Sequence, residues 1–271
     1  ITANRNVKDQ QMDLGIKGRL AIVCASSKGL GFGCAEELAA NGVNLVMNAR
    51  SEELLKSSAA HLLDTYGVEV TAVATDITTP EGRAAVLDGA AGRTVDILVN
   101  NAGGPPPGDF RDWEREDWMG AVNSNMLTPI ELIKAVIDPM IDQRFGRIVN
   151  ITSGSVRNPI PQLGMSNGAR AGLTGFVAGL ARQVAQHNVT INNLLPGQFD
   201  TDRISSLFEA AASKAGKEAA EIRAAAEAAN PCHRIGHIKE FGHACAYLCS
   251  AHSGYMVGQN LLINGGVFNS Q

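Results

Sequence analysis

A strand, a turn and a helix near the start of the chain constrain its fold most. Residues 20–24 form the continuous apolar run LAIVC, which is typical of a parallel strand buried on both faces. Small residues follow, and Gly29 and Gly31 among them let a ligand approach the backbone closely. A helix beginning near Gly31 would direct its unpaired N–H groups at an anion. The stretch is either a phosphate cradle or an ordinary strand-to-helix turn.

The same alternation continues along the chain. Short apolar runs separated by helical stretches occur at residues 20–24, 44–47, 68–74, 97–100, 148–151, 190–194 and 261–263. We expect an α/β fold with a single doubly wound, Rossmann-type parallel sheet and helices on both of its faces. Ligands of such sheets bind beyond the carboxyl ends of the strands, so the segments that follow these runs should surround one crevice.

Length and composition narrow the class of protein. With 271 residues, 45% of them hydrophobic and 18% charged, the chain suits one globular domain, which we place at residues 12–271. We interpret residues 1–11 as a flexible arm or an artificial remnant. The net charge of −4 offers no basic face for nucleic acid or anionic lipid. No apolar run approaches the roughly 20 residues of a membrane span, so we expect no membrane partner and a cytoplasmic location.

The cysteines and histidines give no sign of a metal or of disulfides. The five cysteines lack CxxC or disulfide-type spacing, which fits reduced thiols. Three histidines lie near Cys232 without a complete set of ligand positions, and we therefore expect no metal site.

One segment departs from the regular alternation. Residues 208–229 are rich in Ala, Glu and Lys and should be helical, between Pro196-Gly197 and Asn230-Pro231. Residues 198–230 are then either a lid over the crevice or a surface insertion with no gating role.

Several motifs in order resemble the short-chain dehydrogenase/reductase family, and within it the members similar to ketoacyl-carrier-protein reductases. The resemblance runs from about residue 18 to residue 266. Its motifs are Ser27-Lys28-Gly29-Leu30-Gly31, Asn100-Asn101-Ala102-Gly103, Ile151-Thr152-Ser153, Pro196-Gly197 with Thr201, and Gly258-Gln259 through Asn264-Gly265-Gly266. The resemblance implies a doubly wound sheet that binds a nicotinamide dinucleotide.

The resemblance also implies which residues contact that cofactor. They are Ser27, Lys28, Gly29, Leu30 and Gly31 of the cradle, Asp76 and Ile77 at the adenine, Asn101, Ala102 and Gly103 after the fourth run, Pro196 and Gly197 after the sixth, and Arg170. Asp76 has an alternative interpretation as the N-terminal cap of a helix near Pro80. Asn100 and Asn101 also suit side-chain hydrogen bonds that hold neighbouring strands together.

The residues after the second run favour NADP(H) over NAD(H). An NAD site of this kind carries an acidic residue about 20 positions after the glycines, whereas an Arg accommodates a 2′-phosphate. The chain has Asn48-Ala49-Arg50-Ser51 at this place, and Lys28 adds a second cation. An Arg with a nearby Lys suits a phosphate dianion. The alternative is that both are solvated surface charges.

The reaction centre departs from the family. By resemblance, Asn125 and Ser153 take the places of the family's Asn and Ser, but Ser166 and Arg170 stand where the family has Tyr and Lys. A serine hydroxyl is a far poorer acid than a phenol, so Ser166 is no like-for-like proton donor. In the cradle, Ala25 stands at the place of the first glycine and Cys24 replaces Thr. Tyr255 is expected to pack before the last strand.

We therefore expect an NADP(H)-dependent oxidoreductase that transfers a hydride to or from a small carbonyl or conjugated substrate, with a non-standard proton donor. The alternatives are a catalytically silent NADP(H)-binding sensor or partner subunit and, more remotely, a lyase or isomerase. By resemblance we expect a homodimer or homotetramer that pairs helices around residues 127–144 and 167–186. The second helix carries the small residues Ala169, Ala171, Gly172, Gly175, Ala178 and Gly179. These either permit close helix pairing between subunits or pack within one subunit.

Overall fold

Seven parallel strands form one sheet in the order β3-β2-β1-β4-β5-β6-β7 in the computed structural model, which describes residues 12–268. The strands are β1 (Leu20–Val23), β2 (Asn44–Ala49), β3 (Val70–Ala74), β4 (Ile97–Asn100), β5 (Gly146–Ile151), β6 (Val189–Pro196) and β7 (Asn260–Ile263). The predicted doubly wound α/β sheet is confirmed. The strand order reverses between β1 and β4, and a crevice at their carboxyl ends is the usual ligand site of such a sheet.

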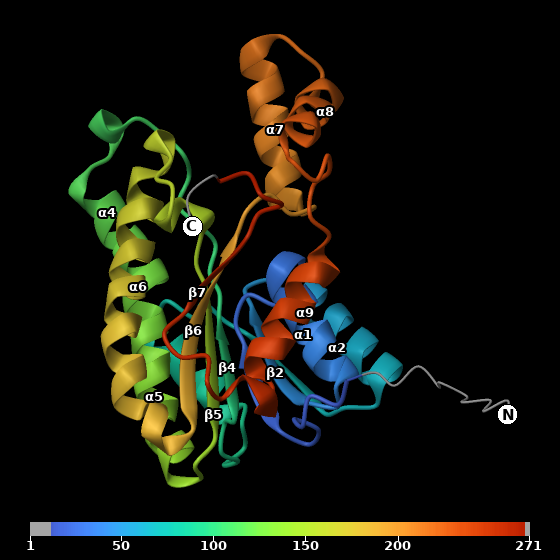
Figure 1. Ribbon diagram of the computed structural model, residues 1–271, viewed down its shortest axis with the longest axis vertical. Coiled ribbons are helices and arrows are strands. Elements are labelled where there is room, and N and C mark those ends of the chain that lie inside the picture. Colours follow the sequence, from blue (N-terminus) through green and yellow to red (C-terminus); the bar gives the residue numbers. More distant parts are fainter. Residues whose placement is uncertain (1–11, 269–271) are drawn as a thin grey trace, which may run out of the picture.

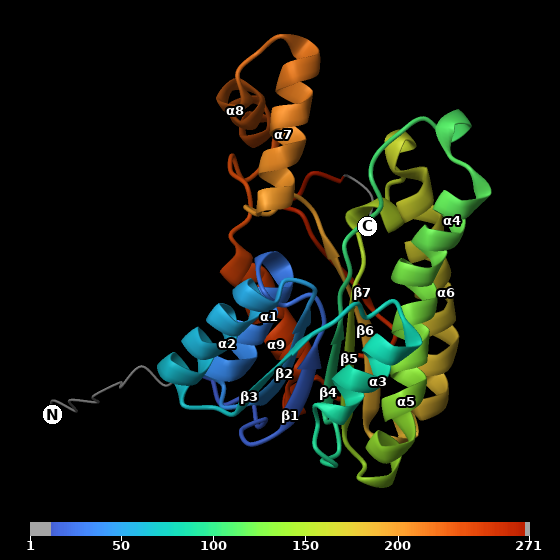
Figure 2. The ribbon, with the colours of Figure 1, turned by 180° about the vertical axis from the view of Figure 1, so that it is seen from behind.

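Helices cover both faces of the sheet (Figures 1 and 2). One face carries α1 (Gly29–Ala40), α2 (Glu52–Tyr66) and α9 (Ile238–Cys249), and the other carries α3 (Pro80–Asp88), α5 (Thr128–Asp142) and α6 (Gly164–Val184). A shorter helix, α4 (Arg115–Val122), precedes α5. Each face has its own apolar core, centred on Leu38, Leu45 and Phe241 on the first face and on Ile22, Leu132 and Val177 on the second. The two cores hold the strand ends, and hence the crevice, in fixed positions.

A ladder of asparagines crosses four strands of the sheet. Asn100 donates to Asn150 (2.9 Å), Asn150 to Asn193 (3.0 Å) and Asn193 to Asn260 (2.8 Å), all between side chains. These residues are direct neighbours in the strand register of β4, β5, β6 and β7. The side chain of Asn101 donates to the carbonyl of Ala25 (3.3 Å). The expectation that Asn100 and Asn101 hold strands together is therefore confirmed.

The segment 198–230 forms a helical hairpin that projects from the carboxyl edge of the sheet (Figures 1 and 2). It consists of α7 (Asp202–Ala215) and α8 (Ala219–Ala229). The expected helical character is confirmed, with an interruption at Gly216, which ends α7 in the left-handed conformation with φ +63°. The side chain of Thr201 caps α7 by accepting from the amide of Ile204, which fixes the start of this helix at Asp202.

Within residues 12–268, no helix is both long and apolar enough to cross a bilayer. The same part of the chain contains no group of three or more His, Cys, Asp or Glu side chains placed to hold a metal ion.

Candidate active site

The turn between β1 and α1 leaves backbone donors without side-chain acceptors. Lys28 is the N-cap residue of α1 but makes no side-chain cap, and the first turn of α1 contains no acidic residue. The helices α3 and α7, in contrast, are capped by threonine hydroxyls. Gly29 adopts φ +61°, which favours glycine. The first-turn N–H groups of α1 are thus open to an anionic ligand.

Gly31 serves packing as well as access. A Cβ at Gly31 would collide with the carbonyl oxygen of Ala25 and lie 2.8 Å from Nδ2 of Asn101. The carbonyl of Ser27 accepts a hydrogen bond from the hydroxyl of Ser58 at 2.8 Å, and Leu30 packs against the core beneath α1. These contacts fix the cradle against the ends of β1 and β4.

Two departures from the family's cradle have visible consequences. Ala25 adopts φ +47°, a conformation that costs an L-residue about 1–2 kcal/mol. Cys24 is fully buried, and burial raises the pKa of its thiol to about 12. This thiol is therefore no proton donor near neutral pH.

The residues expected at the adenine follow β2 and β3. Arg50 is exposed directly beyond β2. Asp76 accepts from the backbone and the hydroxyl of Thr78 (2.9 and 2.8 Å), and these bonds, together with the charge of Arg50, lower the pKa of its carboxyl. Ile77 is buried beside it. The alternative of Asp76 as a helix cap is wrong, because the hydroxyl of Thr79 caps α3.

Lys28 points to a different partner. Its Nζ lies 2.6 Å from Oδ2 of Asp202 at the start of α7, and both side chains are largely exposed. Of the two expected phosphate-binding cations, Lys28 is thus paired with the hairpin, and Arg50 is exposed beyond β2.

Arg170 ties the ends of β4 and β5 together. Its Nη1 donates to the carbonyls of Ile151 (2.8 Å) and Thr152 (2.7 Å), and its Nη2 donates to Ala102 (3.3 Å). The residue is only 7% exposed, and its Nε has no partner within residues 12–268. Burial, with a smaller contribution from the charge of Arg203, lowers the pKa of the guanidinium to about 10. Arg170 remains a cation at neutral pH.

Ser153 and Ser166 lie next to Arg170. Ser153 follows β5, and its Oγ accepts from the amide of Ser155 at 3.1 Å. Ser166, 5% exposed, lies in the first turn of α6, one helical turn before Arg170 and hence on the same helix face. Ser153 thus directly follows Thr152, whose carbonyl Arg170 contacts, and Ser166 shares a helix face with Arg170.

Asn125 reaches the same place from a π-helical turn. This turn, Asn123–Leu127, interrupts the helix between α4 and α5, and such turns are frequent at functional sites. Nδ2 of Asn125 donates to the hydroxyl of Ser124 (2.7 Å) and, more weakly, to the carbonyl of Gly103 (3.5 Å). Its buried Oδ1 has no partner in the part of the chain described. The four expected catalytic positions thus surround the ends of β4 and β5.

The three tyrosines of the chain lie at the other edge of the sheet. Tyr66 ends α2, Tyr247 is in the last turn of α9, and Tyr255 precedes β7. Because every strand is parallel, these positions lie at the amino ends of the strands, opposite Ser153. Tyr255 is fully exposed (102%), so the expectation that it packs before the last strand is wrong.

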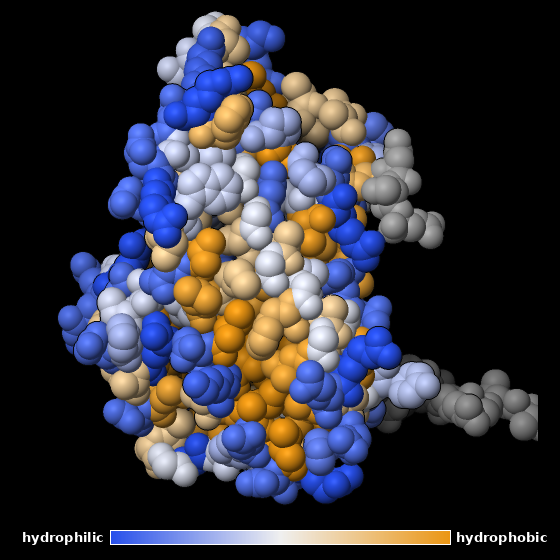
Figure 3. Space-filling model, turned by 90° about the vertical axis from the view of Figure 1, so that its left-hand side faces the viewer, coloured by the Kyte–Doolittle hydropathy of each residue, from blue (hydrophilic) through white to orange (hydrophobic). Residues whose placement is uncertain are grey.

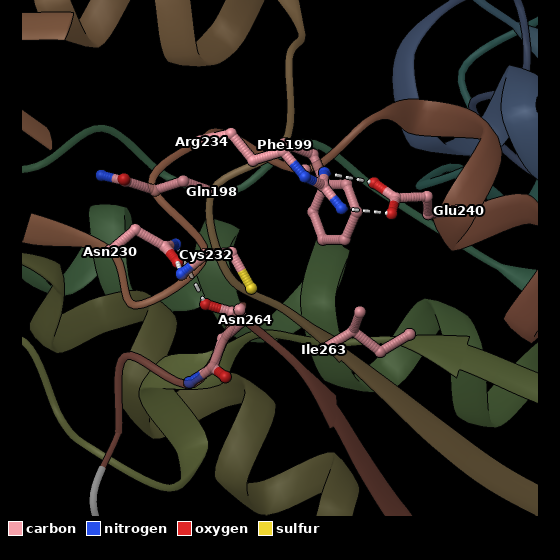
Figure 4. A pocket seen from close by; sticks show the side chains of 10 residues that line it. Gln198, Phe199, Asn230, Cys232, Arg234, Glu240, Ile263 and Asn264 are labelled. Atoms are coloured by element: carbon pink, nitrogen blue, oxygen red, sulfur yellow. Dashed lines mark hydrogen bonds and ion pairs between the residues drawn. The ribbon is translucent and has the colours of Figure 1, made fainter. Parts of the chain in front are cut away.

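Pro196 and Gly197 end β6 beside β7. The amide of Gly197 donates to Ile263 (2.8 Å), and a Cβ at Gly197 would lie 2.7 Å from Cα of Asn264. The glycine therefore permits close approach of the two strand ends. A cavity of about 210 Å³ lies beyond them, crossed by the Arg234–Glu240 ion pair (Figure 4). None of the sequence-predicted site residues lines it.

Sequence reasoning missed Arg203. Its Nη1 donates to the carbonyl of Gly104 (3.2 Å) and its Nη2 lies 3.5 Å from that of Pro105, so it spans the crevice from the start of α7. A signal was available, because a cation stands two positions after Thr201 of the motif.

A family model described as enoyl-(acyl carrier protein) reductase matches residues 24–268, and a 3-oxoacyl-[acyl-carrier-protein] reductase FabG of Vibrio cholerae is 34% identical over 259 residues, covering 94% of this chain and 99% of the relative. The chain belongs to the short-chain dehydrogenase/reductase family. As a member of this family it is an oxidoreductase.

Solved short-chain dehydrogenases/reductases have the same fold. The L-sorbose reductase of Gluconobacter frateurii, complexed with NADPH and L-sorbose, has a TM-score of 0.91 and 27% identity, covering 96% of this chain and 100% of the other. YwfH, an NADPH-dependent reductase involved in bacilysin biosynthesis, has a TM-score of 0.88 and 28% identity, covering 93% of this chain and 99% of the other.

Proposed function

We propose that the chain is an NADPH-dependent reductase that transfers a hydride to a carbonyl or conjugated substrate. The observation that carries the choice of cofactor is Arg50, a cation directly beyond β2 where an NAD-binding site would have a carboxylate. The comparisons support it, since L-sorbose reductase and YwfH are described with NADPH.

The residues present fit a phosphorylated dinucleotide along the crevice. The open first turn of α1, with Gly29 and Leu30, would hold the pyrophosphate. Arg50 would bind the 2′-phosphate, and Lys28 would join it on leaving Asp202. Beyond these cations, Asp76 with Ile77 would contact the adenine, Asn101 with Ala102 and Gly103 the ribose, and Pro196 with Gly197 the nicotinamide end. The bound cofactor would supply the hydride.

The chain's own residues would hold the substrate and the developing negative charge. The hydroxyls of Ser153 and Ser166 are donors for the carbonyl oxygen, and the Arg170 cation stabilises an oxyanion beside them. Asn125 would fix the Gly103 segment through its long hydrogen bond. With every tyrosine at the opposite edge of the sheet, the proton would come from solvent through Ser166. A conjugated or activated substrate would need a less acidic proton donor, because its enolate delocalises the negative charge.

The position of the tyrosines also favours a second candidate function. A chain without a phenol at Ser153 suits a catalytically silent NADPH-binding sensor or partner subunit. This candidate shares the cofactor site but predicts no turnover.

We further propose a homodimer or homotetramer with α5 and α6 at the interface. Hydrophobic side chains gather on the face formed by α4, α5 and α6 (Figure 3). Leu127, directly before α5, and Phe176 on α6 are exposed large hydrophobic residues of these elements. On α6, a Cβ added at Gly175 or Gly179 would have no atom of residues 12–268 within 4 Å apart from the backbone of α6 itself, which leaves room for a second helix. In contrast, Ala169 is buried and Gly172 packs on Met126, so part of the small-residue set serves the subunit itself.

The test of function is NADPH consumption across a panel of ketones, aldehydes and conjugated alkenes. The proposal predicts substrate-dependent loss of NADPH with at least one class. Tight NADPH binding with no oxidation across the panel would support the silent protein instead.

A further inference from the structure

Two guanidinium groups converge on one glycine in the crevice. A Cβ built on Gly104 would lie 3.0 Å from Nη2 of Arg203 and 3.6 Å from Nη2 of Arg170. The two side chains come from opposite walls, Arg170 from α6 and Arg203 from the start of α7. Both bind backbone carbonyls of the segment that follows β4. Two like charges are thus held close together at a single point.

Neither cation has an acidic partner. Within residues 12–268, no carboxylate forms a salt bridge with Arg170 or Arg203. The nearest acids in the sequence are already paired, Asp200 with Arg223 (2.9 Å) and Asp202 with Lys28 (2.6 Å). Burial of an unpaired charge is unfavourable, and mutual repulsion adds to this cost. The Nε of Arg170 is also buried without a partner.

The two neighbouring segments of the chain carry no negative charge that would neutralise these arginines. Residues 101–108 contain no charged side chain, and residues 153–170 contain Arg157 and Arg170 but no acid. A protein with net charge −4 therefore concentrates cations at one end of its crevice. Such a local excess attracts and orients an anion.

The cofactor's phosphates have donors of their own in the first turn of α1 and in Arg50. The start of α7 lies near these donors, since a Cβ built on Gly29 would lie 3.7 Å from the side chain of Thr201. Arg170, however, donates to Thr152, the residue directly before Ser153, where the reacting carbonyl would lie. A nicotinamide riboside carries no anion there. The anion that matches these arginines must arrive with the substrate.

We propose that the substrate carries a carboxylate close to its reacting carbon, and that Arg203 with Arg170 binds it beside Gly104. This inference rests on the proposed reductase function and names its substrate class: 2-oxo acids, 3-oxo acids or conjugated acids. Arg203 is exposed and its carbonyl contacts are long, so it can turn to bind a carboxylate in bidentate fashion. Arg170, which is buried and bonded to backbone carbonyls, supplies a second positive charge in a fixed position.

The test compares matched probes that differ only in charge: pyruvate with pyruvamide, acetoacetate with acetoacetamide, and cinnamate with cinnamamide. Each is titrated by calorimetry into the complex of the protein with NADP⁺, which cannot transfer a hydride to them. We expect at least one acid to bind about tenfold or more tightly than its amide, the usual scale of a charge-assisted pair. Replacing Arg203 by Gln should remove most of this preference. Arg111→Gln is the matched control, since it removes an exposed arginine paired with Asp109 and should leave the preference intact.

The outcomes distinguish a failure of the carboxylate site from a failure of the proposed reductase function. Equal binding of acid and amide, or no binding of any acid in the panel, overturns the carboxylate site while leaving NADPH binding unaffected. If Arg203→Gln weakens NADPH as much as it weakens the acid, Arg203 is a cofactor clamp and the inference is wrong. Absence of NADPH and NADP⁺ binding would remove the proposed function itself, and this inference with it.

Discussion

Nζ of Lys28 lies 2.6 Å from Oδ2 of Asp202, so an ion pair joins the start of α1 to the start of α7 across the mouth of the crevice. The pair connects the cradle to the helical hairpin, and a cofactor phosphate would compete with Asp202 for the same lysine. Exposed pairs of this kind contribute little to stability. Its effect should therefore appear in cofactor binding and not in folding.

Asp202→Asn should tighten NADPH binding, because it frees Lys28 and removes a negative charge beside the phosphates. We expect the Kd to fall roughly threefold to tenfold at low salt and the gain to shrink near about 0.5 M salt, where charges are screened. Fluorescence titration measures both. Glu69→Gln, which frees Arg93 from a comparable exposed pair away from the crevice, is the control and should change nothing. Weaker NADPH binding in Asp202→Asn would show that the pair organises the site instead.

Ala25→Gly should stabilise the protein. The left-handed backbone at position 25 costs an alanine about 1–2 kcal/mol, and a glycine avoids this cost. About 0.5–1 kcal/mol of the gain is lost again, because glycine has more conformational freedom in the unfolded state. The free energy of unfolding should rise by about 0.5–1 kcal/mol in denaturant titrations. As a comparison, Ala39→Gly inside α1 should lower it by about 1 kcal/mol or more. A destabilised Ala25→Gly protein would mean that the turn relaxes when the side chain is absent.

Most of the sheet could be predicted from the sequence, because buried parallel strands are continuous apolar runs. The prediction began β5 at residue 148, whereas the strand starts at Gly146 and includes Arg147. A charged residue in the middle of a sheet is unexpected, but Arg147 donates to Ser250 and to the carbonyl and side chain of Asn188, and it lies 4.4 Å from the ring of Phe145. Ser250 and Asn188 are more than 40 residues away in the sequence, so no local pattern reveals these hydrogen bonds.

Part of the candidate site could also be predicted from the sequence. Ser153, Ser166, Arg170 and Asn125 follow motif positions, and the strand order brings them together. The convergence of Arg170 and Arg203 at Gly104 depends on how α7 leaves β6, which no sequence spacing fixes. The asparagine ladder likewise depends on the register of four strands.

The double substitution Ser166→Tyr with Arg170→Lys should raise the rate of ketone reduction. A phenol beside a lysine and a ribose has a lowered pKa and can deliver the proton that serine cannot. General acid catalysis contributes about 10²–10⁴-fold, so kcat should rise within that range while either single variant gains less. Circular dichroism and NADPH titration confirm that the variants fold. A folded double variant with unchanged kcat would show that protonation is not what limits the reaction.

Gly179→Arg should break the proposed subunit interface without harming the subunit. The position has open space around it in the single chain, so a long charged side chain meets nothing until a second helix approaches. Light scattering should report a dimer or tetramer for the unaltered protein and a smaller species for the variant. Ser57→Arg on the exposed face of α2 adds the same charge elsewhere and should leave the assembly unchanged. An unaltered protein that is monomeric would refute the interface directly.

The central claim is that the cradle and Arg50 select a phosphorylated dinucleotide, and paired titrations with NADPH and NADH test it most directly. We expect NADPH to bind at least about tenfold more tightly than NADH, through charge-assisted bonds to the 2′-phosphate. Arg50→Asp should abolish or reverse that preference without unfolding the protein. Retention of neither nucleotide, or equal affinity for both with no effect of Arg50→Asp, would contradict the account.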